Sequence, residues 1–314
     1  MIAFPVYGLG RIYGGPINGL IASLLSLLSF QYLYRSSLGW FDTDCMNSTW
    51  AFSAAYFFVG FGIESSLKRY LYFFGGISVW ILFMWWWGEI GPITVISLLP
   101  LAVAVVFFYR PKKKEGVLFL GILCLGVLVF LFWKGFAFPF NILKGFINRF
   151  IYLFTEKEVT GFWPPIGAAV AEMAKPSFRE FLVWSTNSLF SLIFSLCGLI
   201  WLFFSHPRKS LFLLPVIGLG VLSIFFEKRY LIFLSPVISL GAGFLVASIW
   251  QMRRRLFVLG FLAPVFTGLI IWPSLKLSFS KTFWPQEPPY QVACLEIAKK
   301  KTPPDAVIWA WWDH

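Results

Sequence analysis

The chain has 314 residues, of which 59% are hydrophobic and 13% charged, and its net charge at pH 7 is +12. Its mean hydropathy is +0.77. Such an apolar composition excludes a soluble domain of this size and predicts an all-α polytopic membrane protein. Because a membrane-spanning helix needs ~20 apolar residues, roughly ten such helices fit into the chain.

Apolar runs bounded by charged residues or by Gly and Pro predict the spans in chain order. The first, at 1 to 10, is a partial span, and residues 1 to 275 together form a transmembrane domain. The remaining spans are predicted at 16 to 34, 48 to 63, 70 to 88, 92 to 109, 117 to 134, 182 to 204, 211 to 226, 230 to 250 and 256 to 275.

Basic residues are concentrated in alternate loops between these spans, where only Glu64 and Glu115 accompany them. The positive-inside rule makes those loops cytoplasmic, so the net positive charge reflects topology and gives no reason to invoke nucleic acid. Pairing with anionic headgroups of the lipid bilayer is the expected role of some of them. The basic residues of these alternate loops are Arg11, Lys68, Arg69, Arg110, Lys112 to Lys114, Arg208, Lys209 and Arg253 to Arg255.

Two external segments, 135 to 181 and 276 to 314, are too long to be turns. Long loops of this kind commonly form lids or binding loops. In the second, an amphipathic helix is predicted from Tyr290 to Lys300 and a short buried strand from Ala306 to Ala310. Residues 276 to 314 are therefore expected to begin an external C-terminal domain, and the chain is expected to be cut at both ends.

Acidic residues alternate in the first external loop, where Asp42 and Asp44 flank Thr43. Carboxylate oxygens are the ligands that hard cations prefer, so the pair can bind one cation or divide direct and supporting roles. Arg35 can neutralise or orient one of the carboxylates. The alternatives are a solvated turn that caps a helix starting near Ser48, and an arginine that reaches the membrane interface.

Three further candidates lie on the same predicted side. Glu172 is a carboxylate within an apolar patch of the long loop, with a surface charge as the alternative. Arg229 lies between two spans, where a guanidinium can bind a lipid-borne phosphate with two hydrogen bonds or simply anchor the interface. Two indole donors and a carboxylate in Trp311, Trp312 and Asp313 can enclose a hydroxyl, although paired Trp near a bilayer also occurs as an aromatic belt.

Together these strings resemble the catalytic subunit of the oligosaccharyltransferases, a family of membrane glycosyltransferases with the GT-C fold. Residues 35 to 47, Arg-Ser-Ser-Leu-Gly-Trp-Phe-Asp-Thr-Asp-Cys-Met-Asn, are similar to the family's second external loop. Ala-Val-Ala-Glu at 169 to 172 is similar to its Ser-Val-X-Glu motif, and Arg229 with Pro236 matches the arginine and proline of its late spans. Trp311-Trp312-Asp313 resembles the start of its Trp-Trp-Asp-Tyr-Gly signature.

The resemblance implies protein N-glycosylation at a prokaryotic inner membrane, with the site facing the periplasm or exterior. An oligosaccharide would pass from a polyprenyl-diphosphate carrier to the asparagine amide of an Asn-X-Ser/Thr sequon in an acceptor polypeptide. The resemblance implies that Asp42 and Glu172 bind Mg²⁺ or Mn²⁺, with Asp44 near the metal and Arg35 in support. Glu172 would also activate the acceptor amide. Arg229 would bind the diphosphate, and the sequon would be bound by Trp311, Trp312 and Asp313.

Some features depart from the family pattern. The family's remaining metal-site aspartate precedes the first residue of this chain, and His314 stands where the family has Tyr. With these departures, two interpretations of the chain stay open, an active transferase and a nonfunctional fragment. Two other classes remain, namely a GT-C glycosyltransferase with a polyprenyl-phosphate sugar donor, which needs no Trp-Trp-Asp, and a transporter or channel. The latter requires ionisable groups at mid-membrane, and the predicted spans have none near their centres.

Overall fold

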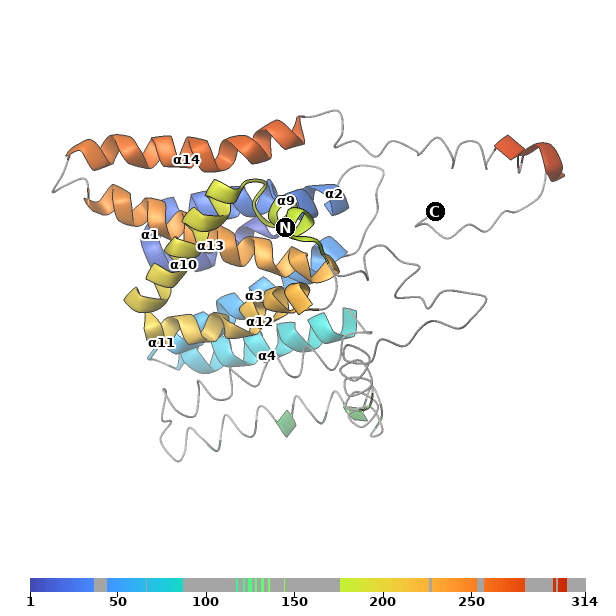
Figure 1. Cartoon of the computed structure of the whole chain (residues 1–314). Coiled ribbons are helices and arrows are strands. Elements are labelled where there is room, and N and C mark those ends of the chain that lie inside the picture. The colour runs from blue at the N-terminus through green and yellow to red at the C-terminus, as the bar shows by residue number, and fades with distance from the viewer. Residues whose placement is uncertain are drawn as a thin grey trace.

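The computed structural model describes residues 1–36, 44–65, 67–86, 176–225, 228–252, 257–279 and 296–303 except 298, together with single residues between 117 and 144. These residues contain helices and no strand, as expected for an all-α membrane protein. The labels follow Figure 1. The elements are α1 (Ala3–Leu27), α2 (Phe30–Ser36), α3 (Asp44–Ile63), α4 (Lys68–Trp86), α9 (Phe178–Ser185), α10 (Leu189–Ser205), α11 (Pro207–Ser210), η3 (Leu211–Leu213), α12 (Leu214–Phe225), η4 (Lys228–Tyr230), α13 (Leu231–Met252) and α14 (Phe257–Ser278).

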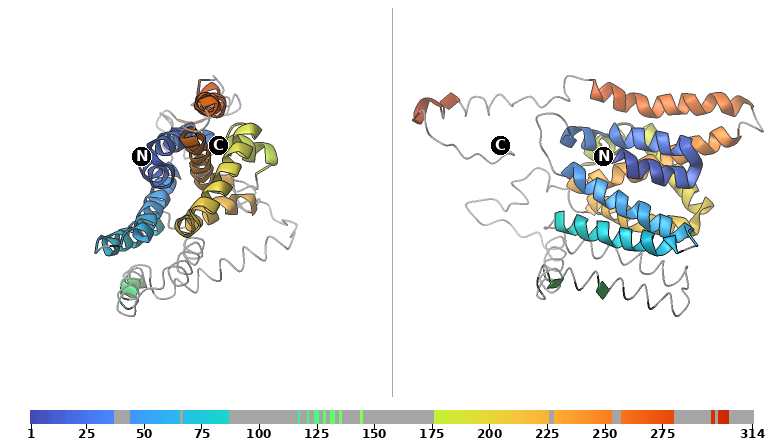
Figure 2. Two further views of the ribbon diagram at one scale, coloured as in Figure 1. Left: turned by 90° about the vertical axis from the view of Figure 1, so that its left-hand side faces the viewer. Right: turned by 180° about the vertical axis from the view of Figure 1, so that it is seen from behind.

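The long helices lie alongside one another, with α14 at one edge of the bundle and α4 near the opposite edge (Figures 1 and 2). Helix α13 lies between them and packs against α1, α10, α12 and α14. No charged residue occurs in α13, and nearly all of its side chains from Leu231 to Ala247 are buried. A helix that is apolar on every side fits either a membrane span or a protein core, and α13 fits both, because it is a candidate span that is buried among its neighbours.

Helix α1 folds back on itself at Gly15, which has φ +83° and is followed by Pro16. Glycine adopts this left-handed backbone without strain, and proline suits the first turn of the helix that follows. The two halves then run antiparallel and so close that a Cβ atom on Gly10 would lie 2.8 Å from the Cα atom of Gly19. A break between the predicted spans 1 to 10 and 16 to 34 is therefore confirmed.

The turn in α1 and the connections from α3 to α4 and from α10 to α11 lie at one end of the bundle (Figure 1). Tyr13 donates a hydrogen bond to the carbonyl oxygen of Lys209 at 3.0 Å, which ties two of these connections together. Arg69 is buried there, with its guanidinium 5.6 Å from the centroid of the Phe61 ring. Basic residues of alternate predicted loops therefore share one end of the described bundle.

The predicted span 70 to 88 corresponds to α4, and the spans 230 to 250 and 256 to 275 correspond to α13 and α14 within a few residues. The span 182 to 204 differs, because α9 and α10 meet at a bend of 70°. Within the described residues, Pro207–Ile224 and Leu231–Met252 are long and apolar enough to cross a membrane, and the bent pair makes a third if it counts as one span. The total of about ten spans stays a prediction.

Close contact between α10 and α13 depends on a pair of glycines. A Cβ atom on Gly198 would collide with the carbonyl group of Gly241, and one on Gly241 would collide with the backbone of α10 at Ser195 and Leu199. Small residues let helix backbones approach closely, which increases dispersion contacts and is a common feature of membrane helix packing. These two glycines therefore set the distance between α10 and α13.

We expect Gly198→Ala and Gly241→Ala each to lower the free energy of unfolding by about 1–3 kcal/mol, because the added methyl group must push the two helices apart. The matched control is Gly218→Ala in α12, where nothing lies within 4 Å of the added Cβ. Alanine is the better helix former, so this control should be neutral or stabilising. Denaturant titration of the detergent-solubilised protein measures the differences, and equal losses in all three variants would contradict the assignment.

Candidate functional site

The structure describes the helical backbone at three of the predicted site residues. Arg35 lies in the last turn of α2, Asp44 is the first residue of α3, and Arg229 is the middle residue of η4. Their side chains lie outside the described part of the chain. So do Asp42, Glu172, Trp311, Trp312 and Asp313 as whole residues. The roles assigned to all eight stay predictions.

Helix α3 begins at Asp44, one turn before Ser48. The alternative interpretation of Asp42 and Asp44, a solvated turn that caps a helix, assumed a helix start near Ser48. The hydroxyl group of Ser48 lies inside the helix, where it donates a hydrogen bond to the carbonyl oxygen of Cys45 at 3.1 Å. A negative charge in the first turn of a helix is stabilised by the unpaired N–H groups there. Asp44 is the first residue of α3, and its role as a cation ligand or as a helix cap stays a prediction.

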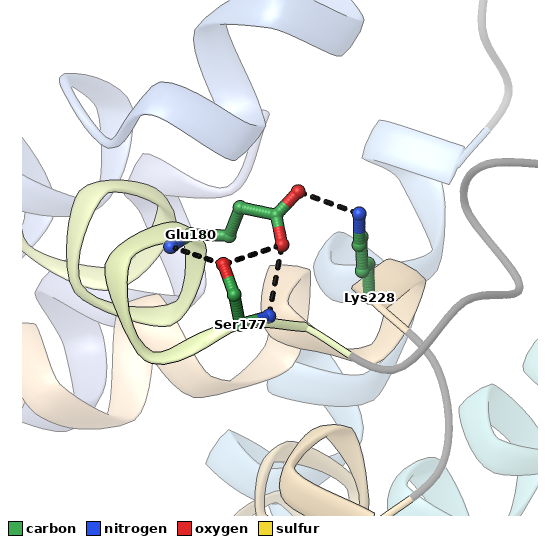
Figure 3. Close-up of polar contacts among 3 residues, drawn as sticks. All are labelled: Ser177, Glu180 and Lys228. Atoms are coloured by element: carbon green, nitrogen blue, oxygen red, sulfur yellow. Dashed lines mark hydrogen bonds and ion pairs between the residues drawn. The ribbon is translucent and has the colours of Figure 1, made fainter.

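Helix α9 starts with a capping box formed by Ser177 and Glu180 (Figure 3). The Ser177 hydroxyl accepts a hydrogen bond from the backbone N–H of Glu180 at 3.3 Å. The Glu180 carboxylate in turn accepts one from the backbone N–H and one from the hydroxyl of Ser177, both at 2.8 Å. Ser-X-X-Glu before an apolar run is a known sequence signal for a helix start. Sequence analysis placed these residues in the long loop and missed that signal.

The second oxygen of the Glu180 carboxylate forms an ion pair with Lys228 of η4, with an Nζ to Oε1 distance of 2.5 Å (Figure 3). The Lys228 side chain is 14% exposed and the Glu180 side chain 35%. The hydrogen bond from Lys228, followed by those from Ser177, lowers the pKa of Glu180 from its ordinary 4.5 to about 2. Glu180 is therefore ionised at neutral pH, and it joins α9 to the turn that contains Arg229.

Apolar contacts hold α9 in the same place. Leu192, Leu231, Leu234 and Ile238 form a buried cluster, and Phe181, Leu182 and Trp184 of α9 pack against it. The Trp184 ring also lies 5.9 Å from the ring of Phe30 in α2. The Ser235 hydroxyl of α13 donates a hydrogen bond to the carbonyl oxygen of Ser185 at 3.1 Å. Because α9 is bent away from α10 and carries Arg179 and Glu180, we place it outside the membrane-spanning part.

Helix α9 thus links the backbone segments that carry the predicted site residues. Helix α2, which contains Arg35, contacts both α9 and α3, and η4, which contains Arg229, is joined to α9 by the ion pair. The chain enters α9 through Ser177, shortly after Glu172. Helices α2 and α9 lie at the end of the bundle opposite α11 (Figure 1). The described structure therefore brings together the backbone segments α2, α3, α9 and η4, whereas the second motif at 169 to 172 lies outside the described residues.

His206, which sequence analysis placed in a cytoplasmic loop, lies at the other end of the bundle. Its Nε2 atom is 3.1 Å from the carbonyl oxygen of Tyr13, and its ring packs against those of Tyr13 and Phe244. These contacts give His206 a structural role, because they link α1, α11 and α13. In the described residues, no group of three or more His, Cys, Asp or Glu side chains could hold a metal ion.

The family model "Oligosaccharyl transferase STT3, N-terminal" matches residues 1–280. The chain belongs to the STT3 family. Membership agrees with the all-helical fold and with the resemblance carried by the sequence motifs. The matched range includes Arg35, Asp42, Asp44, Glu172 and Arg229, and it ends before the Trp311–Asp313 string.

Two curated relatives in this family are similar to the chain. Both are named undecaprenyl-diphosphooligosaccharide–protein glycotransferase, one from Campylobacter jejuni subsp. jejuni serotype O:2 and one from Campylobacter jejuni strain RM1221. Each is 22% identical over an alignment of 291 residues, and the match covers 79% of this chain and 39% of the relative. The chain therefore spans well under half the length of the curated relatives that it matches.

The Glu180–Lys228 pair predicts a particular pH dependence of stability. Because folding lowers the pKa of Glu180 from 4.5 to about 2, the stabilisation by the pair is complete above pH 4.5 and is lost as the pH falls toward 2. We expect Glu180→Gln to lower the melting temperature by a constant amount above about pH 5, and by a decreasing amount below it. Fluorescence-detected melting over a pH series measures this difference. Arg179→Gln on the same helix is the control, and a Glu180→Gln deficit unchanged near pH 2 would contradict the assignment.

Proposed function

We propose that the protein is an oligosaccharyltransferase, which transfers an oligosaccharide from a polyprenyl-diphosphate carrier to the side-chain amide of asparagine in Asn-X-Ser/Thr sequons. The observation that carries the proposal is the meeting of the α2, α3, α9 and η4 segments at one end of the bundle. Four motifs in the family's order support it, as does membership of the STT3 family. A site built from separate loops requires that these loops share one side of the membrane.

The acceptor amide is a poor nucleophile because its nitrogen lone pair is delocalised into the carbonyl group. The rotation barrier of the related peptide bond, ~18–20 kcal/mol, indicates the size of this resonance energy. In the proposed mechanism, the carboxylate of Glu172 accepts hydrogen bonds from the amide N–H₂ group and favours a twisted, less conjugated form. The amide nitrogen then forms a bond to the first sugar carbon, while the bond from that carbon to the diphosphate oxygen breaks. The electron pair of the broken bond leaves with the diphosphate, and the nitrogen releases one of its two protons to water.

Negative charge develops on the departing polyprenyl diphosphate. Arg229 offers a planar guanidinium that can donate two parallel hydrogen bonds to phosphate oxygens, so we assign it to the diphosphate. Arg35, at the end of α2, orients the acidic loop that follows it. Trp311, Trp312 and Asp313 hold the Ser or Thr hydroxyl of the sequon, because two indole donors and one carboxylate acceptor can enclose a hydroxyl group.

The predicted ligand set suits a hard divalent cation. Asp42, Asp44 and Glu172 supply only carboxylate oxygens, which Mg²⁺ and Mn²⁺ prefer. When bound, such a cation offsets charge on the diphosphate as a Lewis acid. In this proposal Asp42 and Glu172 bind the cation directly and Asp44 lies beside it.

We further propose that the protein spans a prokaryotic inner membrane several times, with its site on the periplasmic face. The support is the charge of the alternate loops that contain Lys68, Arg208 and Lys209, where Glu64 and Glu115 are the acidic residues. Helix α11 and the start of α4 lie at the end of the bundle opposite α9 (Figure 1). The positive-inside rule assigns that basic end to the cytoplasm. The lipid-linked donor would then reach the site from the outer leaflet.

Loss of the Glu172 charge should reduce transfer. We expect Glu172→Gln to lower kcat by about 100-fold or more, because an amide cannot replace the carboxylate on the amide hydrogens or on the cation. The assay uses the full protein as the cell makes it, purified in detergent, with a lipid-linked oligosaccharide and a fluorescent Asn-X-Thr peptide. Glu158→Gln, a charge loss in the same long segment, is the matched control. Transfer to a lipid or glycan acceptor but never to the peptide would favour the alternative GT-C glycosyltransferase.

Activity should also depend on a divalent cation. We expect EDTA to abolish transfer, and Mn²⁺ or Mg²⁺ to restore it, because the ligand set consists of carboxylates. Asp42→Asn should raise the Mn²⁺ concentration for half-maximal activity by about 10–100-fold. Titration of the EDTA-treated protein with Mn²⁺ measures both effects. Full activity in EDTA would contradict the metal assignment and leave the other residue roles intact.

A further inference from the structure

The Glu180–Lys228 ion pair joins two segments that lie 48 positions apart in the sequence. One is the first turn of α9, where the chain enters the bundle after the long segment that contains Glu172. The other is the first residue of η4, which connects α12 to α13. Figure 3 shows the Lys228 ammonium pointing across to the carboxylate of Glu180. The pair is therefore a bridge between two parts of the proposed site.

An isolated ion pair on a protein surface usually contributes little, because ordering two long side chains offsets the attraction between them. This pair differs in two ways. The Glu180 carboxylate is already held by the backbone N–H and the hydroxyl of Ser177, and the Lys228 side chain is only 14% exposed. The carboxylate is thus preorganised, and its remaining oxygen can direct the position of the lysine.

The lysine in turn restrains a very short element. Turn η4 consists of Lys228, Arg229 and Tyr230, and Tyr230 is fully buried. Arg229 therefore lies between a residue fixed by an ion pair and a residue fixed by the core. With both neighbours restrained, the backbone of Arg229 has little freedom to shift relative to α9.

We propose that the Glu180–Lys228 pair is a positioning contact that holds the donor-binding Arg229 turn against α9. This inference rests on the proposed function, in which Arg229 binds the diphosphate of the lipid-linked donor. Neither Glu180 nor Lys228 touches substrate in this proposal, so both act through Arg229. Loss of the pair should weaken binding of the donor and leave binding of the acceptor peptide unchanged.

The test is a double-mutant cycle on the full protein in detergent, with Lys228→Met, Glu180→Gln and the double variant. We expect each single variant to raise the KM for the lipid-linked donor about tenfold, because small misplacements of a binding group are costly. The double variant should be no worse than either single variant, and the peptide KM should stay unchanged. Lys228→Arg, which keeps the charge, should restore most of the donor affinity, and Arg179→Gln on the same helix should behave as the wild type.

Hydrogen–deuterium exchange provides a readout that does not need activity. We expect Lys228→Met to speed exchange in both η4 and the first turn of α9, and Lys228→Arg to leave both slow. Any of three results would overturn the inference. They are a donor KM in the double variant raised by the product of the two single effects, a donor KM unchanged in the single variants, and hydrogen exchange that changes in only one of the two segments. If the wild-type protein transfers no oligosaccharide, the proposed function and the donor-binding role of Arg229 fail. Hydrogen–deuterium exchange then still decides whether the ion pair joins η4 to α9.

Discussion

The close packing of α13 against its neighbours is the constraint on which the described structure depends. Glycines make it possible, because Gly241 faces Gly198 of α10 and Gly243 lies against Asn18 of α1. Apolar side chains gain little from association within lipid, so packing without gaps has to supply much of the stability of such a bundle. Turn η4 precedes α13 directly, so the position of this helix also determines where the Arg229 turn lies.

The same constraint explains where polar groups occur. Inside a bilayer no water is available, and many buried hydroxyls of this bundle, such as those of Ser26 and Ser239, donate to a carbonyl oxygen one turn earlier in their own helix. Among the described residues, polar contacts between side chains far apart in the sequence lie at the ends of the helices instead. Glu180 binds Lys228 near η4, and Asn187 donates to the hydroxyl of Ser274 at 2.8 Å. The helix ends thus carry the specific polar contacts.

Hydropathy predicted much of this fold from the sequence. Spans such as 70 to 88 and 230 to 250 were located within a few residues, because length and apolar composition determine where a chain can cross a membrane. Helix α9 was missed because eight residues are too few for a periodic pattern, although the Ser177–Glu180 capping box was readable. Turn η4 was predicted only as a hairpin between spans.

The site was predicted less completely, for a physical reason. A motif identifies residue types, such as the carboxylates of Asp42 and Glu172, and its position in the chain locates them on a loop. Contacts such as Glu180 with Lys228 depend instead on how α9 packs on α13, which local patterns do not encode. The strings that carry the resemblance contain neither Glu180 nor Lys228. Resemblance could therefore propose the reacting groups without naming the contacts that hold their segments.

A site assembled from distant segments needs such supporting contacts. Catalysis requires reacting groups to be held within fractions of an ångström, and loops alone rarely provide this precision. The connection from Phe225 to Leu231 is short, and its described part is a single 3-10 turn that ends at the buried Tyr230. The buried Tyr230 ring fixes one side of this turn. Lys228 lies on its other side, where the ion pair to the capped start of α9 adds a second restraint, and the proposed binding of a diphosphate by Arg229 would depend on both.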